Sequence, residues 1–278
     1  LFIFLAEYQE TLVTNLTHKE VLNFKLKTKK HTSAMGKQII ILAAGKGSRM
    51  NSDLPKVMHK VGGIPMLERV IENCFKVTKD LVLVYSYHIK QYLPSFKDRC
   101  KLVIQEEQLG TAHAVAVTEK LFNNKSNSAV IYGDNPLITS AIINEIFTHL
   151  ENTNSAVVTL AFNHKQPNQY GRIIVDLQGN LKKIIEAKFA NEEEKAITLC
   201  NSGIMAFAPG ILKKYLPECL RYDPNFPKKE LYLTAIIEVC SNAGEKVSYY
   251  LSKDHERVIG VNTQAELEKA NNIIKFLE

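Results

Sequence analysis

A buried strand that runs directly into a glycine turn is the feature that most limits the fold of this chain. Residues Gln38 to Ala43 form an almost continuous apolar stretch, and Gly45-Lys46-Gly47 follows at once. A strand that is apolar on both faces is typical of the centre of a parallel sheet. We therefore expect the turn to lead into a helix and the chain to build βα units.

The alternation of strand and helix continues through the first half of the chain. The sequence predicts helix 66–75, strand 81–85, strand 101–105, a helix that opens at 110–111, strand 129–132, helix 140–150 and strand 156–161. After about residue 165 it predicts a hairpin of strands 171–176 and 181–186, strand 200–208, helix 231–240, strands 247–251 and 258–261, and helix 264–277. Repeated βα units imply an open, mostly parallel, Rossmann-like α/β sheet, here with a smaller antiparallel region.

Three segments are expected along the chain. Residues 1–34 are predicted to be a poorly ordered N-terminal extension, because a basic cluster between Lys25 and Lys30 precedes Met35, which resembles a natural start. This extension is interpreted as a tail or an alternative start, and less readily as a basic targeting arm. Residues 35–263 form the predicted catalytic domain, and residues 264–278 form a C-terminal helix.

Composition excludes several other classes of protein. The chain has 278 residues, of which 45% are hydrophobic, and a net charge of +6, which solvation explains without nucleic acid. Its five cysteines are scattered, with no CxxC pair, so neither a disulfide framework nor a zinc site is indicated. No apolar run approaches the roughly eighteen residues of a membrane span. We expect a cytoplasmic protein that acts on neither nucleic acid nor membrane.

The glycine turn also carries the first chemical signal. Small residues such as Ala44 and Gly45 let backbone N–H groups approach phosphates closely, and Arg49 and Lys56 bring two positive charges to the same loop. A tight βα turn with solvated basic residues is the alternative interpretation. The spacing matches neither a Walker A loop nor the dinucleotide fingerprint, whose third glycine is replaced by Met50.

The loop and later motifs together resemble one family. Leu42-Ala-Ala-Gly-Lys-Gly-Ser-Arg-Met50, followed by Leu54-Pro55-Lys56, is similar to the signature of sugar-phosphate nucleotidyltransferases, and most similar to that of bacterial N-acetylglucosamine-1-phosphate uridylyltransferases. The resemblance extends from about Met35 to Asn262. It implies the nucleotide-diphospho-sugar transferase type of sheet, with Arg49 and Lys56 as the catalytic residues.

The resemblance also implies which residues bind the nucleotide. Gln105-Glu-Glu-Gln108-Leu-Gly110-Thr111 resembles the segment that contacts uracil in that family, and an amide side chain suits an imide edge. The implied nucleotide-binding residues are Leu42, Ala43, Ala44, Gly45, Lys56, Gln108, Gly110, Thr111, Tyr132 and Gly133.

A magnesium site is expected at Asp134. This carboxylate follows the predicted strand 129–132, and the carboxyl ends of parallel strands are where ligands bind in open α/β sheets. The resemblance makes Asp134 and Asn262 the Mg²⁺ ligands. The alternative interpretation of Asp134 is a turn former before Pro136.

The sugar-binding residues implied by the resemblance come from the second half of the chain. They are Gly171 of Tyr170-Gly-Arg172, Glu186, and Asn201 of Asn201-Ser-Gly203. The chain departs from the family in this half, with Glu186-Ala187-Lys188-Phe189 in place of E-H-K-D, and Ala235 in place of the final aspartate of G-E-Y-Y-L-T-D. These departures leave the identity of the sugar open.

The expected activity is uridylyl transfer from UTP to N-acetylglucosamine 1-phosphate, a step toward peptidoglycan and lipopolysaccharide precursors. Two alternatives stay open: transfer to another phosphorylated acceptor, such as a different hexose 1-phosphate or phosphocholine, and a non-catalytic nucleotide-sugar sensor. No hexapeptide repeat precedes Glu278, so we expect no acetyl transfer by this chain. A homo-oligomer and a separate acetyltransferase partner are both compatible with the sequence.

Overall fold

The computed structural model describes residues 35–164, 169–221 and 230–276. Contacts within the chain separate residues 1–36 from residues 37–278, and the second unit contains all the elements described below. The interpretation of residues 1–34 as an extension falls outside the described residues. The division of residues 35–278 into a domain and a separate helix stays a prediction.

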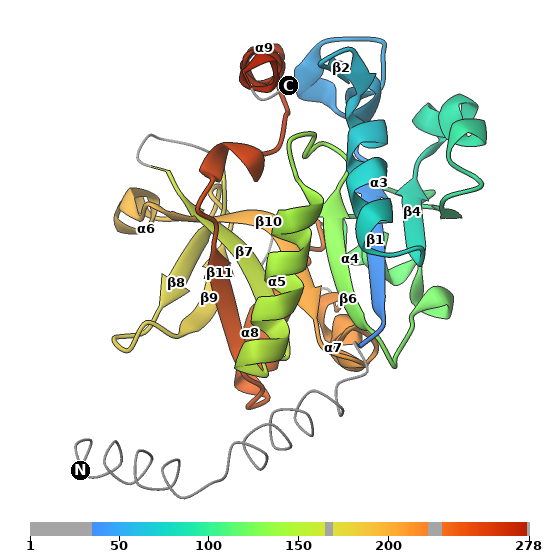
Figure 1. Cartoon of the computed structure of the whole chain (residues 1–278). Coiled ribbons are helices and arrows are strands. Elements are labelled where there is room, and N and C mark those ends of the chain that lie inside the picture. Colours follow the sequence, from blue (N-terminus) through green and yellow to red (C-terminus); the bar gives the residue numbers. More distant parts are fainter. Residues whose placement is uncertain (1–34, 165–168, 222–229, 277–278) are drawn as a thin grey trace, which may run out of the picture. The chain divides into compact units, whose positions relative to one another are not determined.

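Nine of the described strands form one open sheet (Figure 1), in the order β11-β7-β10-β6-β1-β4-β5, with β8 paired to β10 and β9 to β8. Its strands are β1 (Lys37–Ala43), β4 (Leu81–Tyr85), β5 (Lys101–Ile104), β6 (Asn127–Tyr132), β7 (Val157–Asn163), β8 (Arg172–Val175), β9 (Leu181–Ile185), β10 (Leu199–Phe207) and β11 (Val247–Leu251). A separate small hairpin consists of β2 (Lys60–Val61) and β3 (Ile64–Pro65).

The helices lie on both faces of this sheet. The α-helices are α3 (Met66–Val77), α4 (Thr111–Ala116), α5 (Ser140–Thr153), α6 (Glu192–Ala196), α7 (Ile211–Cys219), α8 (Ala235–Asn242) and α9 (Gln264–Lys275). Short 3₁₀ helices are η1 (Ser48–Met50), η2 (Lys56–Met58), η3 (Tyr87–Ser95), η4 (Glu119–Leu121) and η5 (His255–Arg257).

The central strand β1 explains the two-sided core. Ile39 and Ile41 pack into the cluster that contains α3 and α5, and Ile40 and Leu42 pack into the cluster that contains α4, α7 and α8. Since successive side chains of a strand point to opposite faces, a run of apolar residues fills both layers. The five cysteines are buried as thiols within these layers.

The direction of the strands agrees with the predicted sheet. β6, β1, β4 and β5 run parallel, and β11 runs parallel to β7. β10 is antiparallel to β6, β7 and β8, and β8 is antiparallel to β9. The expectation of an open, mostly parallel sheet with a smaller antiparallel region is confirmed.

One predicted element is wrong and another begins later than expected. The helix expected at 231–240 is present as α8 but begins only at Ala235, because the backbone of Leu231 bonds instead to Leu109 and Ala112, at 2.7 and 2.8 Å. Residues 258–261 form no strand, since Val261 N–H donates to the Asp134 carbonyl at 2.8 Å. Leu233, Val258 and Val261 are buried, so these segments are apolar without being helix or strand.

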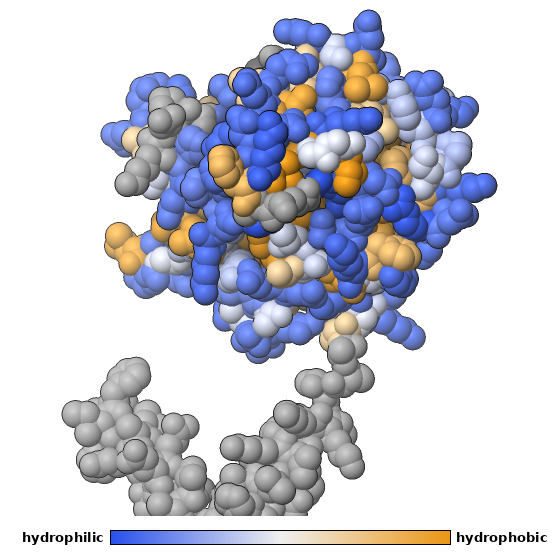
Figure 2. All heavy atoms as spheres, turned by 45° about the horizontal axis from the view of Figure 1, so that its top comes forward, coloured by the Kyte–Doolittle hydropathy of each residue, from blue (hydrophilic) through white to orange (hydrophobic). Residues whose placement is uncertain are grey.

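The surface carries few large apolar side chains. Figure 2 shows a largely hydrophilic face with hydrophobic residues in small patches, and the most exposed large apolar side chains of the described residues include Leu177 and Phe276. None of the described helices combines the length and apolar character needed to cross a membrane.

Candidate active site

A cleft of about 580 Å³ opens at the carboxyl ends of the parallel strands. Segments far apart in the sequence line it: the loop after β1, the loop before α4, the end of β6, the antiparallel region and residues 260–262. Its lining residues are Leu42, Ala43, Ala44, Gly45, Lys46, Arg49, Lys56, Val57, Gln105, Gln108, Gly110, Thr111, Ala114, Tyr132, Asp134, Asn135, Tyr170, Ser202, Glu230, Gly260 and Asn262. Most of the nucleotide-binding residues expected from the sequence are among them.

The loop after β1 has room for a ligand on one side and close packing on the other. No atom lies within 4 Å of the place where a Cβ of Gly45 would be, so that side is open. Gly47 has φ +65°, and a Cβ there would lie 2.5 Å from the Cβ of Lys56. Glycine is therefore required at position 47, because only the bare backbone lets Lys56 cross the loop.

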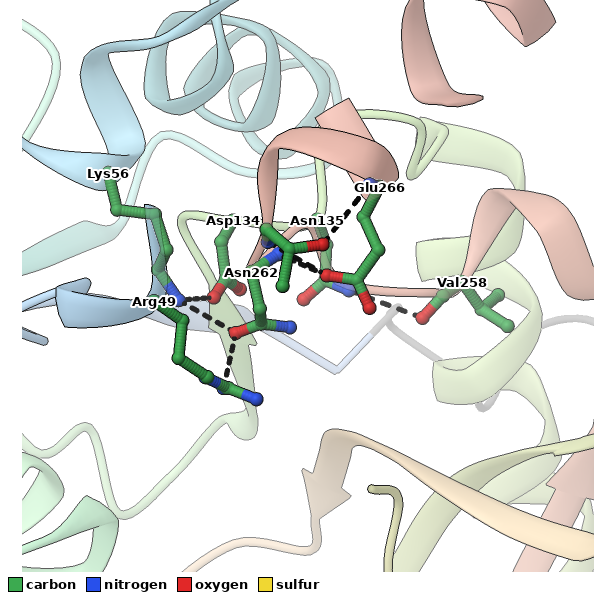
Figure 3. A network of polar contacts seen from close by, with 8 residues as sticks. Arg49, Lys56, Asp134, Asn135, Val258, Asn262 and Glu266 are labelled. Atoms are coloured by element: carbon green, nitrogen blue, oxygen red, sulfur yellow. Dashed lines mark hydrogen bonds and ion pairs between the residues drawn. The ribbon is translucent and has the colours of Figure 1, made fainter. Parts of the chain in front are cut away.

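Four polar side chains meet at one point of the cleft (Figure 3). The Lys56 ammonium donates to the Asp134 carboxylate and, at 3.1 Å, to the side-chain oxygen of Asn262. Arg49 donates to the same Asn262 oxygen at 2.9 Å. The structure thus brings together both predicted catalytic cations and both predicted metal ligands, although their motifs lie up to 213 residues apart.

The chain around Asp134 is fixed by backbone bonds. Gly133 N–H donates to the carbonyl of Leu42 at 2.9 Å, which links the end of β6 to the end of β1. Gly133 itself does not line the cleft: a Cβ there would lie 3.1 Å from Leu67 and 3.3 Å from Ala43. The close packing of Gly133 against these two side chains, rather than contact with a ligand, therefore explains why this residue is small.

Asn262 is held by the first turn of α9. The Glu266 carboxylate accepts from the backbone N–H groups of Asn262 and Thr263, at 2.7 and 3.0 Å, and the Thr263 hydroxyl accepts from Glu266 N–H. This is a capping box, which satisfies donors at the start of the helix. Gln264 also donates to the Met50 carbonyl at 2.9 Å, so α9 contacts the segment that carries Arg49.

The donors at this point fit a divalent cation. Two side-chain oxygens, from Asp134 and Asn262, already converge on one positive charge, the Lys56 ammonium. Hard oxygen donors suit Mg²⁺, which commonly takes one or two protein ligands and completes its shell with phosphate and water. Within the described residues, no group of three or more His, Cys, Asp or Glu side chains could hold a metal. With only Asp134 and Asn262 as protein ligands, a cation here would need phosphate or water for the rest of its shell.

The loop before α4 contains a buried amide that the sequence interpretation missed. Gln105 is only 3% exposed, and its amide donates to the Gly110 carbonyl at 3.1 Å and lies 3.1 Å from Nδ1 of His113. Gln108, the predicted residue, donates at 3.0 Å to the carbonyl of Gln105 and so shapes the same loop. Both glutamines line the cleft. In the sequence, only the motif Gln105-Glu-Glu-Gln108 indicated that Gln105 belongs to the site.

The three predicted sugar-binding residues lie in the antiparallel region beside the cleft, outside its lining. Asn201 is 5% exposed, and its side-chain oxygen accepts from Thr159 at 2.6 Å and from Gly203 N–H at 3.0 Å. The Gly171 carbonyl accepts from Asn201 N–H at 2.9 Å. These contacts join β7, β10 and the turn before β8.

Glu186 is the third of these residues and is mostly buried. Burial raises the pKa of its carboxyl group, and a hydrogen bond from Thr234, 2.7 Å long, partly opposes that rise. Burial also raises the pKa of the Tyr132 hydroxyl, and the nearby Glu186 charge adds to the effect. A carboxyl group in this setting can accept hydrogen bonds from a hydroxyl-rich ligand.

A second polar cluster was not expected from the sequence. Lys188 bonds to the Tyr232 hydroxyl and, at 2.9 Å, to Glu230, and Tyr232 also donates to Glu230. Burial raises the pKa of Tyr232 to about 12, and the bond to Glu230 adds to the rise. Glu230 lines the cleft, so this cluster brings a carboxylate to it, next to Leu231, which bonds to the loop before α4. The residues are up to 44 positions apart, which is why no local motif signalled them.

Comparisons with known proteins show the family of this chain. A family model described as "MobA-like NTP transferase domain" matches residues 39–201, more than half of the chain. The chain is 38% identical over 244 residues to "Bifunctional protein GlmU" of Desulfotalea psychrophila, which covers 86% of this chain and 70% of that protein. It is 39% identical over 239 residues to the protein of the same name from Clostridium botulinum, covering 85% of this chain and 51% of that protein.

A solved structure has the same fold. "UDP-glucose pyrophosphorylase complexed with UDP-glucose" superposes with a TM-score of 0.68 at 17% identity, covering 88% of this chain and all of that chain. At this identity the similarity shows the fold alone. The chain spans about half the length of the Clostridium relative that it matches, so the activities of such a whole protein do not follow for this chain.

Proposed function

The chain belongs to the family of MobA-like NTP transferase domains, and on that premise we propose that it transfers a uridylyl group from UTP to N-acetylglucosamine 1-phosphate. The products would be UDP-N-acetylglucosamine and pyrophosphate. Nucleotidyl transfer follows from the family. The base and the sugar rest on the likeness to the GlmU proteins and on the residues of the cleft.

One observation carries the proposal: Arg49, Lys56, Asp134 and Asn262 converge at one end of an open glycine loop. A triphosphate placed along Ala44 and Gly45 would meet backbone N–H groups first and the two cations next. Preorganised positive charge is what a departing pyrophosphate requires. The alternative interpretations of these residues as turn formers or solvated charges do not account for their convergence.

The reaction follows from this placement. An oxygen of the sugar phosphate attacks the α-phosphorus in line, forming a new P–O bond while the bond to the β-phosphate oxygen breaks. The sugar phosphate is anionic at neutral pH, so no side chain has to remove a proton. Arg49 and Lys56 stabilise the negative charge that develops on the leaving pyrophosphate. A divalent cation held by Asp134 and Asn262 would neutralise phosphate oxygens when bound.

Two sets of residues support the choice of substrates. The amides of Gln105 and Gln108 and the small residue Gly110 suit a flat base with an imide edge. In the antiparallel region beside the cleft and at its edge, Glu186 and the Lys188–Glu230–Tyr232 cluster offer acceptors and donors for sugar hydroxyls. Another phosphorylated acceptor is kept as the second candidate, because Ala187 and Phe189 replace two polar residues of the family motif here.

Pyrophosphate release with a panel of substrates tests the proposal. The full chain is assayed with UTP, CTP, ATP and dTTP against N-acetylglucosamine 1-phosphate, glucose 1-phosphate and phosphocholine, with Mg²⁺ present. We expect the highest kcat/KM for UTP with N-acetylglucosamine 1-phosphate. A clear preference for another acceptor would select the second candidate, and binding of UDP-N-acetylglucosamine without any turnover would select a sensor.

A further inference from the structure

The two candidate metal ligands come from segments that are joined directly to each other. Asp134 lies in the turn after β6, and Asn262 lies in the turn before α9. Val261 N–H donates to the Asp134 carbonyl at 2.8 Å, and the Asn135 amide donates to the Val258 carbonyl at 3.2 Å. The first bond joins two backbone groups, whereas the second has a side-chain donor and joins residues 123 positions apart.

Asn135 is an unusual residue for its surroundings. It is 1% exposed, and its side-chain oxygen has no hydrogen-bond partner within the described part of the chain. A buried polar atom without a partner costs free energy, so the bond of the amide nitrogen to Val258 is obtained at the expense of a buried oxygen without a partner. Figure 3 shows the nitrogen of this amide directed to Val258 and the oxygen directed away from it, toward the side of Asp134 and Asn262.

The segment that Asn135 holds is fixed from its other side as well. Glu266 accepts from Asn262 N–H at 2.7 Å, so the backbone before and after Gly260 is tied at both ends. A Cβ on Gly260 would lie 3.5 Å from a carboxylate oxygen of Asp134, 3.6 Å from the Asn262 amide nitrogen and 3.7 Å from that of Asn135. Three polar side chains therefore surround this glycine, and a shift of the segment would change the separation of the two ligands.

We propose that Asn135 is a positioning residue that sets the distance between the Asp134 carboxylate and the Asn262 amide, and thereby the affinity of the site for its divalent cation. The proposal rests on the proposed function, which assigns these two residues to the metal. Asn135 acts through the segment 258–262 and need not touch the cation. Groups that orient metal ligands typically change metal affinity about 10- to 100-fold when removed.

The test compares Asn135→Leu with a matched control at the start of β6, the strand that precedes Asn135. Asn127, the first residue of β6, is also buried, and its amide donates to Glu151 at 2.8 Å. Asn127→Leu removes a similar long-range bond far from the cleft. Each full-length variant is assayed for pyrophosphate release against Mg²⁺ concentration, for binding of Mn²⁺ alone by electron paramagnetic resonance, and for melting temperature. Asp134→Asn serves as the variant that lacks a ligand.

We expect Asn135→Leu to raise the Mg²⁺ midpoint and the Mn²⁺ dissociation constant about tenfold, with kcat at saturating Mg²⁺ nearly unchanged. Its melting temperature should stay close to that of the wild type, because the loss of the bond to Val258 is offset by removal of the unpartnered oxygen. Asn127→Leu should lower the melting temperature and leave both metal constants unchanged. If Asn135→Leu does not fold, Asn135→Ala removes the same donor with a smaller side chain.

The outcomes separate the two proposals. Unchanged metal constants in the folded Asn135 variant, while Asp134→Asn has lost its response to metal, would overturn the positioning role and keep the metal site. A wild-type metal titration in Asp134→Asn would instead overturn the assignment of the ligands.

Discussion

Replacing Lys56 by methionine should weaken catalysis and strengthen the binding of a cation to the protein alone. In the structure the Lys56 ammonium occupies the position between Asp134 and Asn262, with the side chains of Lys56 and Asp134 only 13% and 14% exposed. The same charge is proposed to stabilise the departing pyrophosphate. Methionine keeps most of the side-chain volume and removes only the charge and its donors.

The two effects have different magnitudes. Loss of one preorganised donor to a developing anion lowers kcat by about 100- to 1,000-fold. Two unit charges 4 Å apart near a protein surface interact with about 4 kcal/mol, which bounds the competition between the ammonium and an entering cation. The substitution also removes the hydrogen bonds of Lys56 to Asp134 and Asn262. We therefore expect only about a third of this energy to appear as tighter binding of the cation, which corresponds to about a tenfold gain in affinity for Mn²⁺.

Two measurements on the same preparation check the prediction. The first is steady-state pyrophosphate release with UTP and N-acetylglucosamine 1-phosphate, and the second is Mn²⁺ binding to the protein without substrates, by electron paramagnetic resonance. Lys60→Met, at an exposed lysine of β2, controls for the loss of a positive charge. Turnover near that of the wild type would refute the role in catalysis, and an unchanged or weaker Mn²⁺ affinity would refute the competition for the ligands.

Two further pairs of measurements follow from the structure. Gly47→Ala should lower the free energy of unfolding by about 1–2 kcal/mol and reduce turnover, because φ at Gly47 is +65° and the new Cβ would press on Lys56. Gly45→Ala should keep the melting temperature of the wild type and raise KM for UTP, because that side of the loop is open. Equal melting temperatures for the two variants would contradict this account of the loop. Glu186→Gln should be stabilising at neutral pH, since burial raises the pKa of Glu186 above its ordinary value of 4.5 and ionisation of the folded wild type then costs stability as pH rises. The difference in melting temperature between variant and wild type should therefore grow from about pH 4.5 upward and level off above the pKa of Glu186 in the folded protein. A difference that is constant from pH 4 to 8 would show that ionisation of Glu186 does not lower the stability of the wild type.

The sequence predicts best the strands that are marked by a short apolar run between two turns. β4 and β11 have the predicted bounds, and β1 differs by one residue, because each is a short run of apolar or aromatic residues between turns. Residues 258–261 have the same composition but form no strand. Their backbone is held instead by bonds to the Asp134 carbonyl and to the Asn135 amide, and these contacts come from more than 120 positions away. No pattern with a period of two can distinguish the cases.

The site shows the same limit. The glycine loop and the aspartate after β6 could be found from the sequence because each stands at the end of a buried strand, and such ends meet at one edge of a parallel sheet. The Lys188–Glu230–Tyr232 cluster could not, since Lys188 follows β9 while the other two precede α8. Their charges are paired only through the fold. The departures from the family motif at Ala187 and Phe189 flank Lys188, so sequence similarity says least about the residues proposed to bind the sugar.

The C-terminal helix bears most directly on how the site is built. Its sequence predicts an amphipathic element that closes the chain, and the spacing of Thr263 and Glu266 is that of a helix start. In the structure the same two residues fix the backbone of Asn262, because Glu266 accepts from both Asn262 and Thr263. A contact that stabilises the helix thus also orients a candidate metal ligand. The beginning of α9 therefore lies beside the candidate site, and we expect its capping residues to affect both stability and the affinity for a cation.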